Sequence, residues 1–148
     1  MKQRGFSLLE LLVVIVLVAL MMALVGTSIS RSVSNAELRS ASRGLLAALR
    51  YTQTHAIVSH QEQVLTIDME NRSYQPPNRE AVNFPEGIEV SMVTAQSELL
   101  SDRVGGIRFF PDGGSTGGKV TVHVKERQYE INIAWLTGEA RMSRLENG

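Results

Sequence analysis

The sequence contains no cysteine, which excludes a disulfide scaffold, a thiolate metal site and a cysteine nucleophile. It also lacks a net charge, because 15 lysine and arginine residues balance 15 aspartate and glutamate residues. A balanced charge argues against a protein that coats nucleic acid. Proline is absent before Pro76, so no proline breaks a helix in the first half of the chain. The 148 residues allow one modest domain rather than two.

A long apolar run stands near the beginning of the chain. Between Phe6 and Gly26 the only charged residue is Glu10. A helix of this length spans about 30 Å, the thickness of a bilayer core, so we predict a transmembrane helix over residues 6–26. A cleaved secretory signal would be shorter and would lack an internal acid. An ordinary membrane anchor would leave Glu10 as an unexplained cost of about 2–3 kcal/mol at mid-bilayer.

The residues that precede Glu10 complete a recognisable signal. The stretch KQRGFSLLE, residues 2–10, resembles the class III signal of type IV pilins and type II secretion pseudopilins. The resemblance implies that residues 1–5 are a leader, and that prepilin peptidase cuts between Gly5 and Phe6. It implies that the new amino group of Phe6 is methylated. It also implies a single-pass protein of the inner membrane, with its C-terminal domain in the periplasm.

The spacing of Phe6 and Glu10 gives this signal a physical sense. The two residues are four apart, so the new ammonium and the carboxylate share one helix face. A carboxylate near a helix N-terminus is also favoured by the helix dipole. In a filament, Glu10 would instead pair with the Phe6 amine of a neighbouring subunit, and a paired charge tolerates apolar surroundings better than a lone one. Glu10 is therefore the predicted assembly residue.

The helical pattern continues beyond the apolar run. In residues 27–59, apolar and small side chains recur at steps of three and four, as on one face of a helix. We expect one long helix from about Phe6 to about Ser59 that is amphipathic in its second part. Its polar face is either a solvated surface or a surface that meets acidic neighbours in a filament, and it carries Arg39, Arg43 and Arg50.

After residue 60 the pattern changes to short alternating runs separated by turns. All four prolines and nine of the twelve glycines follow residue 75. We therefore expect an α+β, pilin-like fold, in which residues 60–148 form a small antiparallel β-sheet or sandwich covered by the long helix. Residues 97–103 are predicted to form a loop or a helical turn. The predicted strands are residues 64–69, 88–93, 107–110, 119–125 and 129–136, with a hairpin turn before Tyr74.

A glycine-rich segment, Gly113 to Lys119, matches the first part of a phosphate-binding loop. The full motif needs serine or threonine next and then a helix, whereas here Val120 and a predicted strand follow. We interpret the segment as a loop between strands. Residues 107–118 and the run from Ile133 to Gly138 resemble the C-terminal module of the GspH/FimT family, in which the latter run is the final strand and turn.

No constellation of catalytic or metal-binding residues stands out. His55 and His60 are five residues apart and do not share a helix face, and His123 stands alone in a predicted strand. Asp102 and Asp112 flank a glycine-rich region without the dense oxygen ligands that calcium needs. We predict no enzyme activity, no cofactor and no metal site. Trp135, the single tryptophan, is expected in the core or at an interface.

The family resemblance implies a structural subunit. Its members include minor pseudopilins of the H type, which lie at or near the tip of the type II secretion pseudopilus and assist export of folded proteins across the outer membrane. The implied partners are other minor pseudopilins, the major pseudopilin, prepilin peptidase and, before assembly, inner-membrane lipid. The alternative is a FimT-like minor type IV pilin that binds DNA for uptake. Nucleic acid is not the expected partner, because glutamates are interleaved with Lys119, Lys125, Arg127, Arg141 and Arg144.

Overall fold

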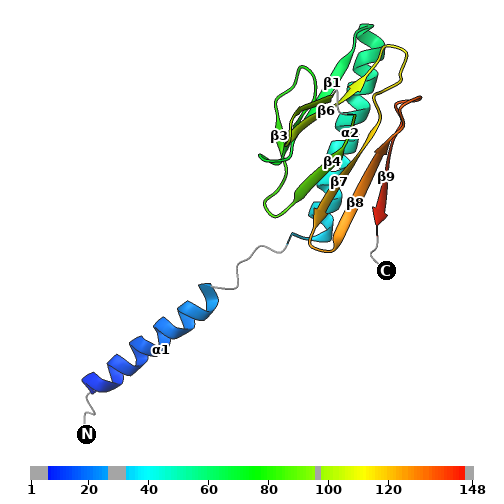
Figure 1. The fold of residues 1–148 in the computed structure, drawn as a ribbon. Coiled ribbons are helices and arrows are strands. Elements are labelled where there is room, and N and C mark those ends of the chain that lie inside the picture. The colour runs from blue at the N-terminus through cyan, green and yellow to red at the C-terminus, as the bar shows by residue number, and fades with distance from the viewer. Residues whose placement is uncertain (1–6, 27–32, 96–97, 146–148) are drawn as a thin grey trace. The chain divides into compact units, whose positions relative to one another are not determined.

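The structure of the chain is a computed structural model that describes residues 7–26, 33–95 and 98–145 (Figure 1). The chain has two parts. It divides into two units, residues 1–32 and residues 33–148. Every buried apolar side chain of the described structure belongs to the second unit, which therefore has a complete hydrophobic core of its own. We call this second unit the globular domain.

The first unit contains helix α1, Leu8–Gly26. The helix begins at Ser7, whose carbonyl oxygen accepts hydrogen bonds from the backbone N–H groups of Glu10 and Leu11. Within the described residues, no helix combines the length and the apolar character needed to cross a membrane. The predicted span over residues 6–26 stays a prediction, and residue 6 and the side chains of residues 23–26 lie outside the described part of the structure.

Helix α2, Asn35–Ser59, has a start of its own. Ser34 has an extended backbone, with φ −71° and ψ 157°, so no continuous helix passes through it. The Ser34 hydroxyl accepts from the Glu37 N–H at 3.1 Å, and the Glu37 carboxylate accepts from the Ser34 N–H at 2.9 Å, which forms a capping box. The single helix predicted from Phe6 to Ser59 is therefore wrong at this point.

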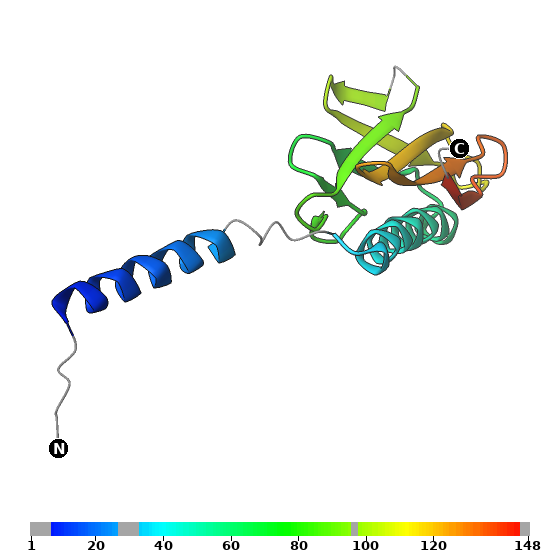
Figure 2. The ribbon, with the colours of Figure 1, turned by 90° about the horizontal axis from the view of Figure 1, so that it is seen from below.

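Among the described residues of the globular domain, nine strands form two antiparallel sheets (Figures 1 and 2). The first sheet has the order β3-β2-β1-β6-β5, and the second has the order β4-β7-β8-β9. The strands of the first sheet are β1 Gln63–Asp68, β2 Ser73–Gln75, β3 Val82–Asn83, β5 Leu99–Ser101 and β6 Val104–Phe109. Those of the second are β4 Glu89–Val93, β7 Gly118–Val124, β8 Arg127–Ile133 and β9 Ala140–Leu145.

The core lies where α2 meets both sheets. The buried face of α2 repeats at three and four residues, as its sequence pattern predicts, and consists of Leu38, Ser42, Leu45, Ala48, Leu49, Thr52 and Ala56. It packs against buried side chains that alternate along the strands, among them Leu65, Phe109 and Ile131. The α+β class with antiparallel sheets is thus confirmed.

The strand predictions are confirmed for β1, β4, β6 and β7, and need correction elsewhere. The strand predicted over residues 129–136 ends at Ile133, and the segment to Gly138 is a turn that leads into β9 rather than the end of the sheet. Residues 99–101 of the predicted loop form β5. Lys119 begins no helix but lies in β7, so the glycine-rich segment joins strands, as expected.

Candidate functional site

Of the predicted processing and assembly residues, the structure describes only Glu10. Gly5 and Phe6 lie outside the described residues. Glu10 stands in the first turn of α1, where the helix dipole favours a carboxylate, and its side chain is exposed. Among the described residues no ion pair involves Glu10.

The three histidines occupy separate places. His55 stacks on Tyr51, with ring centroids 5.7 Å apart, and contacts the Asn78 amide. His60 closes the C-terminus of α2 in a left-handed conformation, and His123 lies 3.1 Å from Glu89 across β4 and β7. Within the part of the chain that is described, no three histidine, aspartate or glutamate side chains gather as metal ligands.

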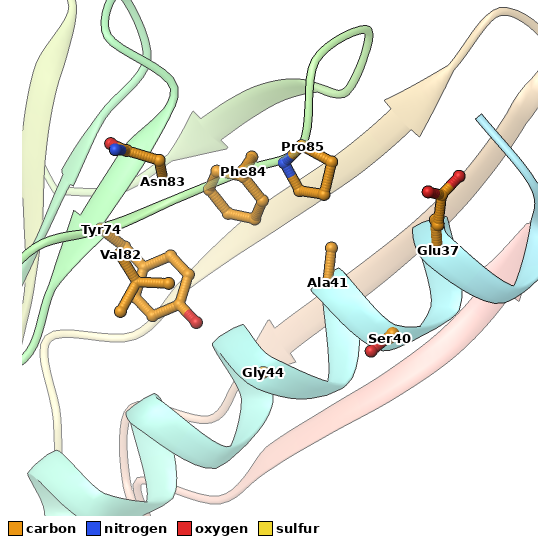
Figure 3. A pocket seen from close by; sticks show the side chains of 9 residues that line it. All are labelled: Glu37, Ser40, Ala41, Gly44, Tyr74, Val82, Asn83, Phe84 and Pro85. Atoms are coloured by element: carbon orange, nitrogen blue, oxygen red, sulfur yellow. The ribbon is translucent and has the colours of Figure 1, made fainter. Parts of the chain in front are cut away.

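An open groove of about 270 Å³ separates the first half of α2 from β2 and β3 (Figure 3). Tyr74 and Phe84 form its floor, with ring centroids 5.2 Å apart. Gly44 allows this packing, because a Cβ at that position would lie 3.1 Å from the Tyr74 hydroxyl. Burial raises the pKa of Tyr74, so the phenol stays neutral. The groove's carboxylate, Glu37, is already engaged in the capping box, so the lining resembles a packing surface more than a reaction centre.

The outward face of α2 carries the arginines that the sequence singled out. Arg39, Arg43 and Arg50 are all exposed. Arg50 donates a hydrogen bond to the Ala140 carbonyl at 3.4 Å, which ties the helix to β9. Arg39 and Arg43 are four residues apart on the helix, a like-charge spacing that costs about 0.2–0.5 kcal/mol. Neither forms an ion pair within the described residues, so this face remains compatible with solvent or with an acidic neighbour.

A second surface, which sequence analysis missed, lies where α2 ends. Four large apolar side chains are exposed there, and we call them the apolar cap: Ile57, Val58, Trp135 and Leu136. Trp135 is 70% exposed and Leu136 is 69% exposed, so of the two positions expected for Trp135, in the core or at an interface, the core is excluded. Both stand on the turn between β8 and β9, which the sequence suggested was still strand. Because these residues were expected in a strand, the sequence did not indicate an exposed apolar surface here.

Hydrogen bonds hold this turn against its neighbours. The Ser115 backbone N–H donates to the Trp135 carbonyl at 2.8 Å, and the Ser115 hydroxyl donates to the Ala134 carbonyl at 3.0 Å. The Gln53 side-chain amide donates to the Gly113 and Thr137 carbonyls, each at 2.8 Å. Three segments distant in sequence therefore meet: the end of α2, the glycine-rich loop and the β8–β9 turn.

Gly138 allows the close approach of these segments. It has a left-handed backbone, with φ +64°, and a Cβ there would lie 2.2 Å from the Gly113 carbonyl oxygen. Beside it, the pKa of Glu139 is lowered by a hydrogen bond from Arg141 and by the positive charges of Arg141 and Arg50. Glu139 is thus ionised at neutral pH.

Gln53→Met is expected to lower the free energy of unfolding of the globular domain by about 1–3 kcal/mol, because two hydrogen bonds are lost. Methionine has a similar volume, so packing is little changed. Urea denaturation of the fragment 33–148 measures the change. Gln61→Met is the matched control, since Gln61 is exposed just beyond the end of α2. Equal stability of the two variants would contradict the bracing role of Gln53.

Comparison with known families gives two matches along the chain. A model of the prokaryotic N-terminal methylation motif matches residues 1–26. A model described as type II transport protein GspH matches residues 41–137. A curated relative, type II secretion system protein H of Xanthomonas campestris pv. campestris, is 36% identical over 142 residues, which covers 96% of this chain and 84% of the relative.

Solved structures share the fold at low sequence identity. The minor pseudopilin EpsH of the type 2 secretion system of Vibrio cholerae matches with a TM-score of 0.58 and 15% identity, over 73% of this chain and 97% of that chain. The type IV minor pilin FimU of Pseudomonas aeruginosa matches with a TM-score of 0.57 and 12% identity, over 73% of this chain and 89% of that chain. At these identities the likeness establishes the fold alone.

Proposed function

This chain belongs to the GspH family of type II transport proteins, and on that premise we propose that it works as a minor pseudopilin of a type II secretion system. The observation that carries this function is the order of two family matches, a methylation motif over residues 1–26 and the GspH domain over residues 41–137. The 36% identical relative is named for the same secretion system. The protein is a structural subunit, and its position is at or near the tip of the pseudopilus.

Assembly begins with processing of the N-terminal residues in the membrane. Prepilin peptidase removes residues 1–5 by cutting between Gly5 and Phe6, and the new amino group is methylated. The apolar segment holds the precursor in the inner membrane, with the globular domain in the periplasm. The match to the methylation motif and the apolar composition of α1 support these steps.

Filament formation then exchanges lipid contacts for helix packing. The exposed Glu10 carboxylate pairs with the charged amine at Phe6 of a neighbouring subunit. The pair neutralises the carboxylate charge, which would otherwise be costly in an apolar bundle. The globular domain contacts the other minor pseudopilins and the major pseudopilin.

A DNA-uptake role, the alternative from sequence, is not favoured. The curated relative belongs to a secretion system. Two of the basic residues considered for DNA binding are also paired with glutamates: Lys119 lies 3.1 Å from Glu130, and Arg141 lies 2.8 Å from Glu139. Paired cations contribute little to the phosphate contacts on which DNA binding depends.

Gly5→Leu tests processing and function together. In a strain that lacks this gene, the wild-type chain should restore release of exoprotein into the medium. Gly5→Leu should accumulate as an uncut precursor and leave the exoprotein in the periplasm, because the peptidase meets a bulky side chain at the cleavage site. Gln3→Leu is the matched control and should be cut normally. A mature mass for Gly5→Leu would refute the cleavage site, and normal exoprotein release in the strain without the gene would refute the function.

A further inference from the structure

The apolar cap stands at the C-terminal end of α2, and α2 runs along the globular domain from the end where the chain enters (Figure 1). Entry is at Val33, whose carbonyl accepts a hydrogen bond from Arg127 at 2.8 Å, beside the β7–β8 turn. From Arg127, strand β8 runs seven residues to Ile133, and the cap turn follows directly. A strand of this length spans about 20 Å, so the cap and the entry point stand at opposite ends of the second sheet.

The cap is held in place by the fold. Its turn is fixed by the hydrogen bonds from Ser115 and Gln53 described above, and a Cβ built on Gly113 of the glycine-rich loop would lie 3.6 Å from the Cδ1 of Ile57. A rigid surface loses little conformational entropy on binding. Tryptophan is also the residue type most enriched among those that dominate binding energy at protein interfaces. An exposed tryptophan on a braced turn therefore has the properties of a binding anchor.

Charged side chains of both signs lie beside the cap turn. Arg141 and Arg50 act on the Glu139 carboxylate, and the Asp112 carboxylate accepts a hydrogen bond from the Gly114 N–H in the neighbouring glycine-rich loop. The turn therefore presents no purely basic surface to the phosphates of nucleic acid or to anionic lipid headgroups. The cap therefore fits a partner surface that is itself apolar.

We propose that the apolar cap is the docking surface for the globular domain of another pseudopilin, which approaches from the end remote from the chain's entry. This inference rests on the proposed function. Neighbours in a helical filament make heterologous contacts, in which one surface meets a different surface of the next subunit. The cap of one subunit thus does not meet a second copy of itself. The exposed aromatic and aliphatic side chains insert into an apolar recess of the neighbour.

The single tryptophan provides the readout, because Trp135 belongs to the cap itself. The fragment 33–148, which contains the whole described core, is titrated separately with the soluble domains of the other minor pseudopilins and of the major pseudopilin from the same secretion system. One of them should shift the tryptophan emission to shorter wavelength. Leu136→Ser should weaken that binding at least tenfold and retain the fluorophore. The affinity should change little between 50 and 500 mM salt.

Leu100→Ser is the matched control, since Leu100 is 72% exposed on β5, far from the cap turn in the fold. Equal loss of affinity in both leucine variants, or no emission shift with any pseudopilin domain, would overturn the proposal. An emission shift with phosphatidylethanolamine–phosphatidylglycerol vesicles, or with rising concentration of the fragment alone, would assign the cap to lipid or to self-association instead. Secretion restored by the full-length Leu136→Ser and Trp135→Ser chains would remove the cap's role and leave the proposed function intact.

Discussion

Glu10→Val is expected to enter the inner membrane as well as the wild-type chain does, and yet to fail in supporting secretion. Valine removes the only charge between Phe6 and Gly26, so insertion becomes more favourable. In the filament that we propose, the same change leaves the amine at Phe6 of a neighbouring subunit without its carboxylate. Removing one partner from a buried ion pair costs about 3–5 kcal/mol, which corresponds to a loss of assembly of more than a hundredfold.

Two measurements separate insertion from assembly in this variant. Membrane fractionation measures insertion, and exoprotein in the culture medium measures a working pseudopilus. Glu10→Asp is the control, because it keeps the charge one methylene closer to the helix, and it should retain part of the secretion. Normal secretion by Glu10→Val would remove the pairing role assigned to this carboxylate.

Leu49→Ala is expected to lower the free energy of unfolding of the globular domain by about 2–5 kcal/mol. Leu49 is fully buried on the face of α2 that meets both sheets, so truncation leaves a cavity that the surrounding strands fill only in part. Such a loss is a large share of the stability of a domain of this size. Urea denaturation of the fragment 33–148, followed by circular dichroism, measures it.

The control for this prediction is again a leucine. Leu100→Ala removes the same atoms from a side chain that is 72% exposed, and it should change the free energy of unfolding by less than about 0.5 kcal/mol. If the two variants unfold at the same urea concentration, the packing of α2 on the sheets is not the main source of stability in this domain.

The sequence predicts the buried face of α2 and four of the strands because each carries a regular period. Leu45, Leu49 and Ala56 repeat at helical spacing, and β7 alternates residue by residue. Strand β9 escapes detection, because only Ala140 and Met142 supply apolar alternation and Arg144 ends it, at the edge of the sheet. Its place is fixed by pairing with β8 rather than by its own composition.

The start of α2 and the β8–β9 turn were misread because stronger sequence patterns surround them. The start of α2 is marked by serine at position 34 and glutamate at position 37, the spacing of a capping box, yet the helical period on both sides suggested a continuous helix. The cap turn contains Trp135 and Leu136, whose apolar character mimics a strand. The segment is a turn because backbone hydrogen bonds join Ala134 to Gly138 and Glu139, and hydrogen bonds from the distant Gln53 and Ser115 hold it in place.

The capped beginning of α2 also bears on how proteins of this kind diversify. Ser34 and Glu37 form the capping box that starts α2, and Arg127 donates a hydrogen bond to the Val33 carbonyl where the globular domain begins. The globular domain therefore does not need the preceding segment to start this helix. Recombination near residue 33 would therefore join this globular domain to the N-terminal segment of another protein without disturbing either part. In a secretion system of the kind proposed, the N-terminal segments can stay alike because one peptidase processes them all, while the globular domains diverge to take different positions along the filament.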